Sequence, residues 1–206
     1  DGQLVFLAPH TKFVYRGKNT TIPVGHAFPY HCTQEVYDEI GRQMQAAVSA
    51  AGADQCSVNA DVFVDGNKVS IIEMGGRTGA TCIPELISIY YGFDFYEKML
   101  RSALGEQVEF NCTGSQPCMA KLLLSPVEGK ITSIDKEGIR TLEEQGVTVS
   151  LDFPVGHKVF AMADGTDRIG HIIACTEEES QLDAWMMQVY RCICVDGETL
   201  EDIWKR

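Results

Sequence analysis

The stretch that decides the fold is Asn59-Ala60-Asp61-Val62-Phe63-Val64-Asp65-Gly66-Asn67-Lys68-Val69-Ser70-Ile71-Ile72-Glu73-Met74-Gly75-Gly76-Arg77. Two runs of β-branched and apolar residues flank Asp-Gly-Asn, which is a strong turn signal, so the stretch predicts a β-hairpin. If the loop comprises the three residues 66–68, Asp61 lies directly opposite Glu73. Paired residues on one face of a hairpin have Cβ atoms only about 5 Å apart.

Two carboxylates held face to face repel each other unless a shared proton or a cation sits between them. Hard oxygen ligands of this kind suit Mg²⁺, which keeps some of its waters and takes other ligands from phosphates. The spacing therefore indicates a site for a metal-bound nucleotide. A second interpretation stays open, because a two-residue turn at Gly66-Asn67 would shift the register by one and put Glu73 on the face opposite Asp61. The stretch would then be an ordinary hairpin with two solvated acids.

A glycine-rich run, residues 75–80, follows the second acid directly. Glycines let the backbone approach an anion closely, and successive N–H groups in such turns form anion-holding concavities. Gly76 and Gly79 are therefore candidate phosphate contacts, and the guanidinium of Arg77 matches a phosphate or a carboxylate. A plain surface turn would have a similar composition. The combination of acids, glycines and an arginine favours a site.

The first acid, the twelve-residue step to Ile-Ile-Glu and the arginine four residues further on resemble the ATP-grasp superfamily. That superfamily includes biotin carboxylase, the carbamoyl-phosphate synthase large chain and amino-acid ligases. The resemblance implies that Asp61 and Glu73 hold the Mg²⁺ (or Mn²⁺) of bound ATP, and that Arg77 binds the acyl-phosphate or the acceptor. It also implies that Phe63 packs against adenine, with Ile72 nearby.

One position departs from the family pattern, because Gly75 stands where the family usually has a metal-binding Asn. A small residue there resembles the branch that joins a carboxylate to an amine. The resemblance implies transfer of the γ-phosphoryl group of ATP to the carboxylate and displacement of phosphate by the amine. The alternatives are an enzyme acting on bicarbonate, like carbamoyl-phosphate synthase or biotin carboxylase, and a degenerate ATP-grasp module without catalysis.

Basic residues near the start of the chain are further candidates. Arg16 and Lys18 occupy positions where relatives of this family place basic residues that touch phosphate, although a solvated turn explains them equally well. His26, in Pro-Val-Gly-His, is a candidate contact for the acceptor substrate. A lone histidine beside proline and glycine is more often structural.

Composition excludes several classes of function. The net charge of −12 argues against a nucleic-acid or anionic-membrane partner. The eight cysteines include no Cys-x-x-Cys pair, which suggests free thiols in a reducing, cytoplasmic setting. The sequence shows no signal peptide and no run long enough to span a membrane.

The pattern of elements predicts an α+β fold. We expect the C-terminal lobe of an ATP-grasp fold, an antiparallel sheet with helices, over residues 1–110, and a small strand-rich α+β subdomain over 111–206, with a polar linker at 106–117. Expected helices are one that Thr33 caps and Gly52 ends, one from Pro84 to near Gly92, one from Asp94 to Gly105, and one over 177–189. Expected strands cover 3–7, 12–16, 20–25, 118–125, 129–134, 147–151, 158–163, 168–174 and 192–195.

The chain opens without Met, and it has no recognisable glycine-rich phosphate loop or paired lysines of the kind that precede this region in the family. We therefore expect the C-terminal half of a longer ligase, inactive by itself. Its expected partners are the missing N-terminal half, a small-molecule carboxylate and an amine. A homodimer is compatible with this interpretation.

Overall fold

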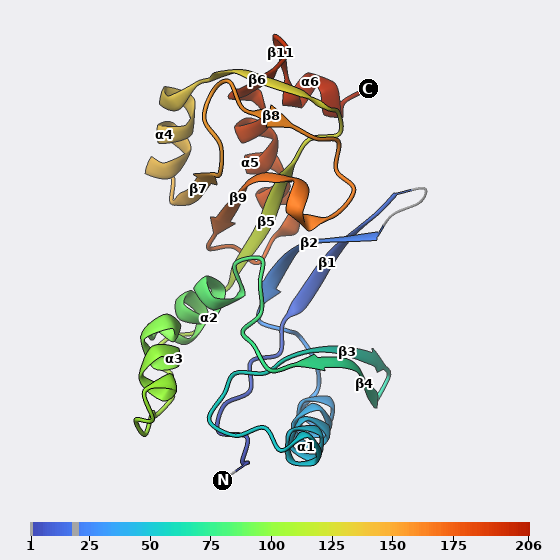
Figure 1. The fold of residues 1–206 in the computed structure, drawn as a ribbon, viewed down its shortest axis with the longest axis vertical. Coiled ribbons are helices and arrows are strands. Elements are labelled where there is room, and N and C mark those ends of the chain that lie inside the picture. Colours follow the sequence, from blue (N-terminus) through green and yellow to red (C-terminus); the bar gives the residue numbers. More distant parts are fainter. Residues whose placement is uncertain (1, 18–20) are drawn as a thin grey trace. The chain divides into compact units, whose positions relative to one another are not determined.

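The computed structural model describes residues 2–17 and 21–206. The chain forms two compact units: unit 1 comprises Asp1–His10 and Phe28–Gln116, and unit 2 comprises Thr11–Ala27 and Pro117–Arg206 (Figure 1). The sequence predicted one division at 110/111, whereas the structure assigns residues 11–27 to the second unit. The physical reason is backbone pairing, because the hairpin of β1 and β2 joins the sheet of unit 2.

Unit 2 is built on a five-stranded sheet in the order β1-β2-β5-β9-β7. The antiparallel pairs include β1 with β2, β5 with β9 and β7 with β9. Gly25 allows β2 to approach β5, because a Cβ at this position would lie 2.1 Å from the carbonyl oxygen of Ala120. The strands are β1 (Thr11–Arg16), β2 (Thr21–Phe28), β5 (Cys118–Leu124), β7 (Val147–Leu151) and β9 (Arg168–Ala174).

A second sheet of unit 2 has the strand order β11-β10-β6-β8. Its strands are β6 (Gly129–Ile134), β8 (Lys158–Val159), β10 (Ile193–Val195) and β11 (Glu198–Thr199). Three helices, α4 (Lys136–Glu144), α5 (Glu179–Arg191) and α6 (Leu200–Trp204), and a short 3₁₀ turn, η1 (Gly165–Asp167), complete the unit. Leu182 and Val189 of α5 are fully buried in the same apolar core as Leu123 and Ile172 of the five-stranded sheet.

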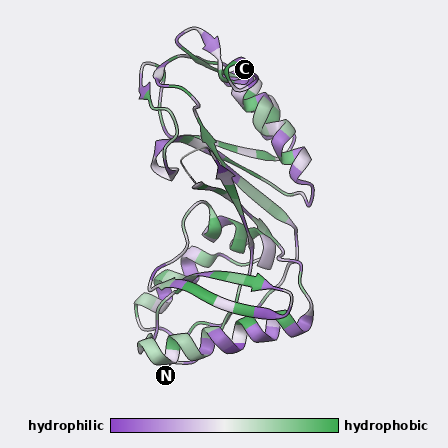
Figure 2. Ribbon diagram, turned by 90° about the vertical axis from the view of Figure 1, so that its right-hand side faces the viewer, coloured by the Kyte–Doolittle hydropathy of each residue, from purple (hydrophilic) through white to green (hydrophobic). Residues whose placement is uncertain are grey.

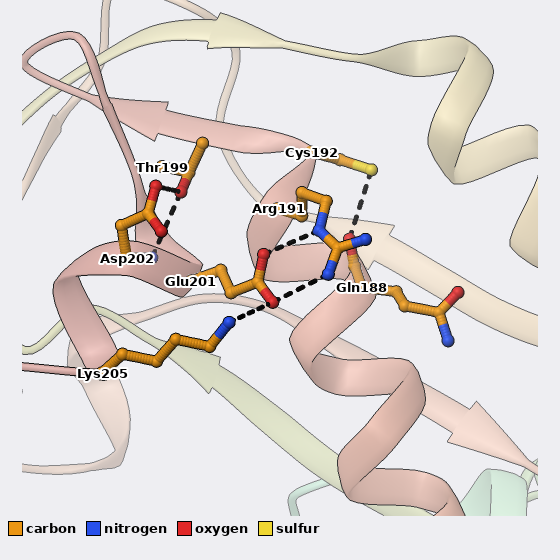
Figure 3. Close-up of polar contacts among 7 residues, drawn as sticks. All are labelled: Gln188, Arg191, Cys192, Thr199, Glu201, Asp202 and Lys205. Carbon is orange, nitrogen blue, oxygen red and sulfur yellow. Dashed lines mark hydrogen bonds and ion pairs between the residues drawn. The ribbon is translucent and has the colours of Figure 1, made fainter.

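Ion pairs join α5 to α6 (Figure 3). Glu201 accepts two hydrogen bonds from the guanidinium of Arg191, at 2.7 and 2.9 Å, and one from the ammonium of Lys205 at 2.8 Å. These two cations lower the pKa of Glu201 to about 2. Glu201 is only 7% exposed, and Arg191 and Lys205 compensate its charge within the fold.

Unit 1 contains a long helix that packs on a two-stranded sheet. Helix α1 (Gln34–Ala51) begins at Thr33, whose hydroxyl accepts the N–H of Val36 at 3.3 Å, and it ends at Gly52 in the left-handed region. The hairpin comprises β3 (Asn59–Asp65) and β4 (Lys68–Gly75). Figure 2 shows hydrophobic residues along both strands, and their inner side chains share one core cluster with Val36, Ile40, Met44 and Val69.

Two further helices follow the hairpin in unit 1. Helix α2 (Ile83–Tyr91) ends at Gly92 in the left-handed region, and α3 (Phe95–Ala103) begins at Asp94, whose carboxylate accepts the N–H of Glu97 at 3.0 Å. Tyr91 contacts the ring of Phe6, which joins the first residues of the chain to α2. In the described part of the chain, no helix is long and apolar enough to cross a membrane.

The α+β class predicted from the sequence is confirmed, but several elements differ. Residues 3–7 do not form a strand, because Leu4 and Leu7 pack against the α1–hairpin cluster and the N–H of Leu4 donates to the side-chain oxygen of Gln45 at 2.8 Å. The strand expected over 158–163 shrinks to Lys158–Val159. Four short elements were missed: α4, which Asp135 caps, η1, β11 and α6.

Candidate functional site

The hairpin turns over two residues, not three. Asp65 pairs with Lys68 and Val64 with Val69, so the loop is Gly66-Asn67, with Gly66 in the left-handed region at φ 56°. The expected three-residue loop is therefore wrong. In a regular ladder, this shorter turn would place residue 72 opposite Asp61 and would send Glu73 to the other face.

A β-bulge cancels that shift. The register changes between Val62, which pairs with Ile71, and Asp61, which pairs with Glu73. Ile72 is the extra residue, and it returns the acid to the position opposite Asp61. The facing pair expected from the sequence is thus present, although a bulge produces it where the sequence suggested a longer loop.

Alternation along the strands separates the two faces of the hairpin. Ala60, Val62 and Val64 pack in the core cluster with α1, so Asp61 and Phe63 lie on the outer face. Phe63 and Ile72 are 59% and 68% exposed. Asp61 is half-buried and Glu73 is exposed. The outer face therefore presents two carboxylates beside two uncovered apolar side chains.

These two acids could supply part of a metal coordination shell. No group of three or more His, Cys, Asp or Glu residues that could hold a metal occurs among the described residues. A cation between Asp61 and Glu73 would therefore take its other ligands from water or from a bound anion. Mg²⁺ binds in this way, through one or two carboxylates plus waters and substrate phosphates, so the donor set fits it.

The glycine run leaves β4 in a tight turn. The N–H of Arg77 donates to the carbonyl of Gly75 at 2.8 Å, and its guanidinium donates to the carbonyl of Thr78 at the same distance. Arg77 is exposed. A Cβ on Gly76 would meet no atom within 4 Å, whereas one on Gly79 would lie 2.5 Å from Cδ1 of Ile83. Gly76 thus borders open space, and Gly79 is required for packing against α2.

The loop ends at Thr81 and Cys82, which no sequence motif marks as unusual. Thr81 and Cys82 both have positive φ, at 57° and 64°, and Cys82 is the N-cap of α2 without a side-chain cap bond. A β-branched residue in the left-handed region is strained, and such strain concentrates at functional sites. Neither residue type is typical of this conformation, so the sequence carries no signal for it.

Other residues proposed from the sequence belong to unit 2. His26 lies on β2, is 5% exposed and pairs across the ladder with Lys12. Arg16 ends β1 and is exposed. Lys18, and the first residue of the strand expected over 20–25, lie outside the described residues.

Comparison with known structures identifies the architecture. The chain superposes on phosphoribosylglycinamide synthetase from Anaerococcus prevotii with a TM-score of 0.77 and 22% identity, over 94% of this chain and 50% of that one. The chain has an ATP-grasp fold. The L-amino acid ligase from Bacillus licheniformis matches with a TM-score of 0.69 at 16% identity, over 91% of this chain and 50% of that one. Biotin carboxylase from Campylobacter jejuni, in a beta-gamma-ATP complex, matches with a TM-score of 0.61 at 16% identity, over 87% of this chain and 41% of that one.

Sequence comparison adds one relative. The "Uncharacterized protein y4rH" from Sinorhizobium fredii is 25% identical over 168 residues, which cover 81% of this chain and 35% of that protein. No protein-family model matches the chain. The chain thus spans about half the length of the structures above and about a third of this relative.

Proposed function

We propose that this chain is part of an ATP- and Mg²⁺-dependent ligase that activates a carboxylate as an acyl-phosphate and couples it to an amine. The observation that carries the proposal is the pairing of Asp61 with Glu73 across the bulge, on a face where Phe63 and Ile72 are uncovered. Two carboxylates that hold a cation beside an apolar platform suit a ligand that is anionic at one end and aromatic at the other. A nucleotide with its metal has this character.

Asp61 and Glu73 would hold the divalent cation, Mg²⁺ or Mn²⁺. When bound, the cation supplies neutralisation of the charge that develops on the phosphoryl oxygens. The facing acids give the cation a defined position, because both strands are fixed from behind by the core with α1. Gly75 offers no side chain as a further ligand, so we assign the cation to these two carboxylates.

The remaining residues of the outer face and loop position the nucleotide and the reacting carboxylate. Phe63 and Ile72 would pack against the adenine ring. Gly76, which borders open space, and Gly79 would present backbone N–H groups to phosphate. Arg77 would bind the acyl-phosphate, because its planar guanidinium matches the oxygens of a phosphate.

The proposed assignment also includes Lys18, as a contact to phosphate, and His26, as a contact to the acceptor substrate. We further propose that the rest of the protein supplies the substrate-binding part, since the chain spans half the length of the matched synthetase and amino-acid ligase. A cytoplasmic enzyme, monomeric or homodimeric, with a net charge of −12 and no nucleic-acid partner is consistent with this role.

The experiment that tests the metal role is ATP turnover by the whole protein with Glu73→Gln. Loss of one anionic ligand should reduce turnover by about 100-fold or more, which corresponds to roughly 3 kcal/mol of transition-state stabilisation. Asp65→Asn is the matched control, because it removes the same charge from the same hairpin but outside the facing pair. Turnover of Glu73→Gln within twofold of the unaltered protein would refute the assignment.

Measurements of ADP release and of Mg-ATP binding distinguish two other functions. ADP release that is stimulated by bicarbonate and not by amino acids would indicate a carboxylase-like or carbamoyl-phosphate-synthase-like enzyme. Gly75, in place of a third metal ligand, favours a degenerate module. In that case Mg-ATP would bind in isothermal titration without any acid-stimulated release of ADP.

A further inference from the structure

Two cysteines lie opposite each other at the ends of adjacent strands, β5 and β9, of the five-stranded sheet of unit 2. Strands β5 and β9 pair antiparallel, with Met119 opposite Ala174 and Ala120 opposite Ile173. One step further in the same register places Cys118 opposite Cys175. Burial raises the pKa of Cys118, and the nearby thiol of Cys175 raises it further, in agreement with this register.

The spacing of such a pair suits a covalent bond. Directly opposite residues in antiparallel strands have Cα atoms about 4.5–5.5 Å apart. Disulfides span Cα separations of about 4.4–6.8 Å, so the backbone already lies within range. Both cysteines are reduced in this structure.

The environments of the two thiols differ. Cys118 is completely buried at the first position of β5, whereas Cys175 is exposed directly after β9. Burial raises the pKa of both thiols, that of Cys118 to about 12. Both therefore persist as thiols at neutral pH, and only the exposed one is open to an oxidant in solution.

We propose that Cys118 and Cys175 form a redox modification site, at which a low-molecular-weight disulfide such as oxidised glutathione converts the pair to an intramolecular disulfide. The site is independent of the nucleotide chemistry proposed above, because it uses none of the residues assigned to the metal, the nucleotide or the substrates.

The reaction balances in two exchanges. The Cys175 thiolate, having released its proton to solvent, attacks one sulfur of oxidised glutathione; a Cys175–glutathione mixed disulfide forms and one glutathione thiolate leaves and takes up a proton. The Cys118 thiol then loses its proton, attacks the Cys175 sulfur and expels the second glutathione. The two protein thiols lose two electrons, and one oxidised glutathione is reduced to two glutathione thiols.

The bond would lock a structurally important position. Cys118 is the first residue of β5 and directly follows Pro117, where the chain re-enters unit 2. Cys175 precedes α5, whose Glu179 and Asp183 hold the ammonium of Lys121 at 2.7 and 2.6 Å. Oxidation would therefore fix the entry of β5 to the exit of β9, and reduction would release it.

The test is oxidation of the native protein by oxidised glutathione at pH 8.5, with peptic digestion at acid pH to prevent exchange and mass spectrometry of the unreduced peptides. We expect a crosslink between peptides containing Cys118 and Cys175 that dithiothreitol removes. Cys56→Ser, which removes an exposed thiol of unit 1, should leave the crosslink unchanged. Cys175→Ser should abolish it and should leave Cys118 unmodified.

Three results would overturn the proposal. One is a protein in which Cys175 carries glutathione while Cys118 stays unmodified. Another is a crosslink that joins a different pair of cysteines in place of this one. The third is glutathionylation of Cys118 in the Cys175→Ser variant at the rate seen for Cys175, since the exposed thiol would then not be the entry point.

Discussion

Replacing Glu73 by Gln should make the hairpin more stable when no divalent cation is present. Two unit charges about 5 Å apart repel each other by about 0.8 kcal/mol in water, and by more where the effective dielectric constant is lower. Asp61 is half-buried and Glu73 is exposed, so the water limit applies only in part. We therefore expect a stabilisation of about 1 kcal/mol from Glu73→Gln in the presence of a chelator.

Magnesium should reverse the order of stability. A cation present at ten times its dissociation constant stabilises the native state by about 1.4 kcal/mol. The unaltered protein should gain this stabilisation, and Glu73→Gln should gain little, because one of the two ligands has lost its charge. The variant would then be the more stable protein in EDTA and the less stable one in excess Mg²⁺.

Hydrogen exchange is the appropriate assay. Both tryptophans, Trp185 and Trp204, lie in unit 2, so tryptophan fluorescence does not report on the hairpin. Mass spectrometry of peptides that cover 59–75 measures opening of the hairpin directly. Protection should change about fivefold per kcal/mol. Compared with the unaltered protein, Glu73→Gln should exchange more slowly in EDTA and faster in Mg²⁺.

A matched control separates repulsion from a general effect of charge. Asp65 pairs with Lys68 on the same hairpin, so Asp65→Asn removes an attraction and should destabilise by about 0.2–1 kcal/mol. Mg²⁺ should still protect the hairpin of Asp65→Asn from hydrogen exchange. Faster exchange of Glu73→Gln in EDTA, or equal protection of both variants by Mg²⁺, would show that the two acids do not act on each other.

Two further predictions concern unit 2. Tyr190→Phe should lower the free energy of unfolding of this unit by about 1–3 kcal/mol, because the buried N–H of Leu124 loses its acceptor, the tyrosine hydroxyl at 3.0 Å; a urea titration followed by tryptophan fluorescence that shows no change would contradict this. Because Arg191 and Lys205 lower the pKa of Glu201 to about 2, its contribution to stability should be complete above its usual pKa of about 4.5 and should disappear as the pH falls towards 2. Glu201→Gln should therefore be less stable than the unaltered protein at pH 7 and equally stable near pH 2, and a difference that persists at pH 2 would refute the pairing.

The hairpin shows both the strength and the limit of sequence reasoning. The facing of Asp61 and Glu73 was predicted correctly, but from a three-residue loop that the structure does not contain. Gly66-Asn67 favours a two-residue turn, and the bulge at Ile72 then restores the pairing. A bulge depends on which residues of β4 pack against α1, so the local sequence does not specify it.

Local signals predicted two capped helices, α1 and α3, but not α4, which Asp135 also caps. Thr33 and Gly52 bound α1, and Asp94 begins α3, because side-chain and left-handed caps act within one turn of the chain. The assignment of β1 and β2 to unit 2 could not be predicted in this way. It depends on pairing with β5, roughly 100 residues away, and on the close approach that Gly25 permits.

The strain at Thr81 and Cys82 was also beyond the sequence. These residues adopt positive φ without being glycine or asparagine, and the surrounding turn determines that conformation. By contrast, the ATP-grasp fold was predicted from the acids, the glycine run and Arg77. Those residues were informative through the family resemblance that they carry, and not through their conformational preference.

Anomalous diffraction from crystals grown with Mn²⁺ and a non-hydrolysable ATP analogue tests the central claim most directly. A manganese peak about 2.1 Å from one carboxylate oxygen of Asp61 and one of Glu73, with analogue phosphate oxygens in the same shell, is the expected result. A peak held by other residues, with the two carboxylates pointing to opposite faces of the hairpin, would contradict it.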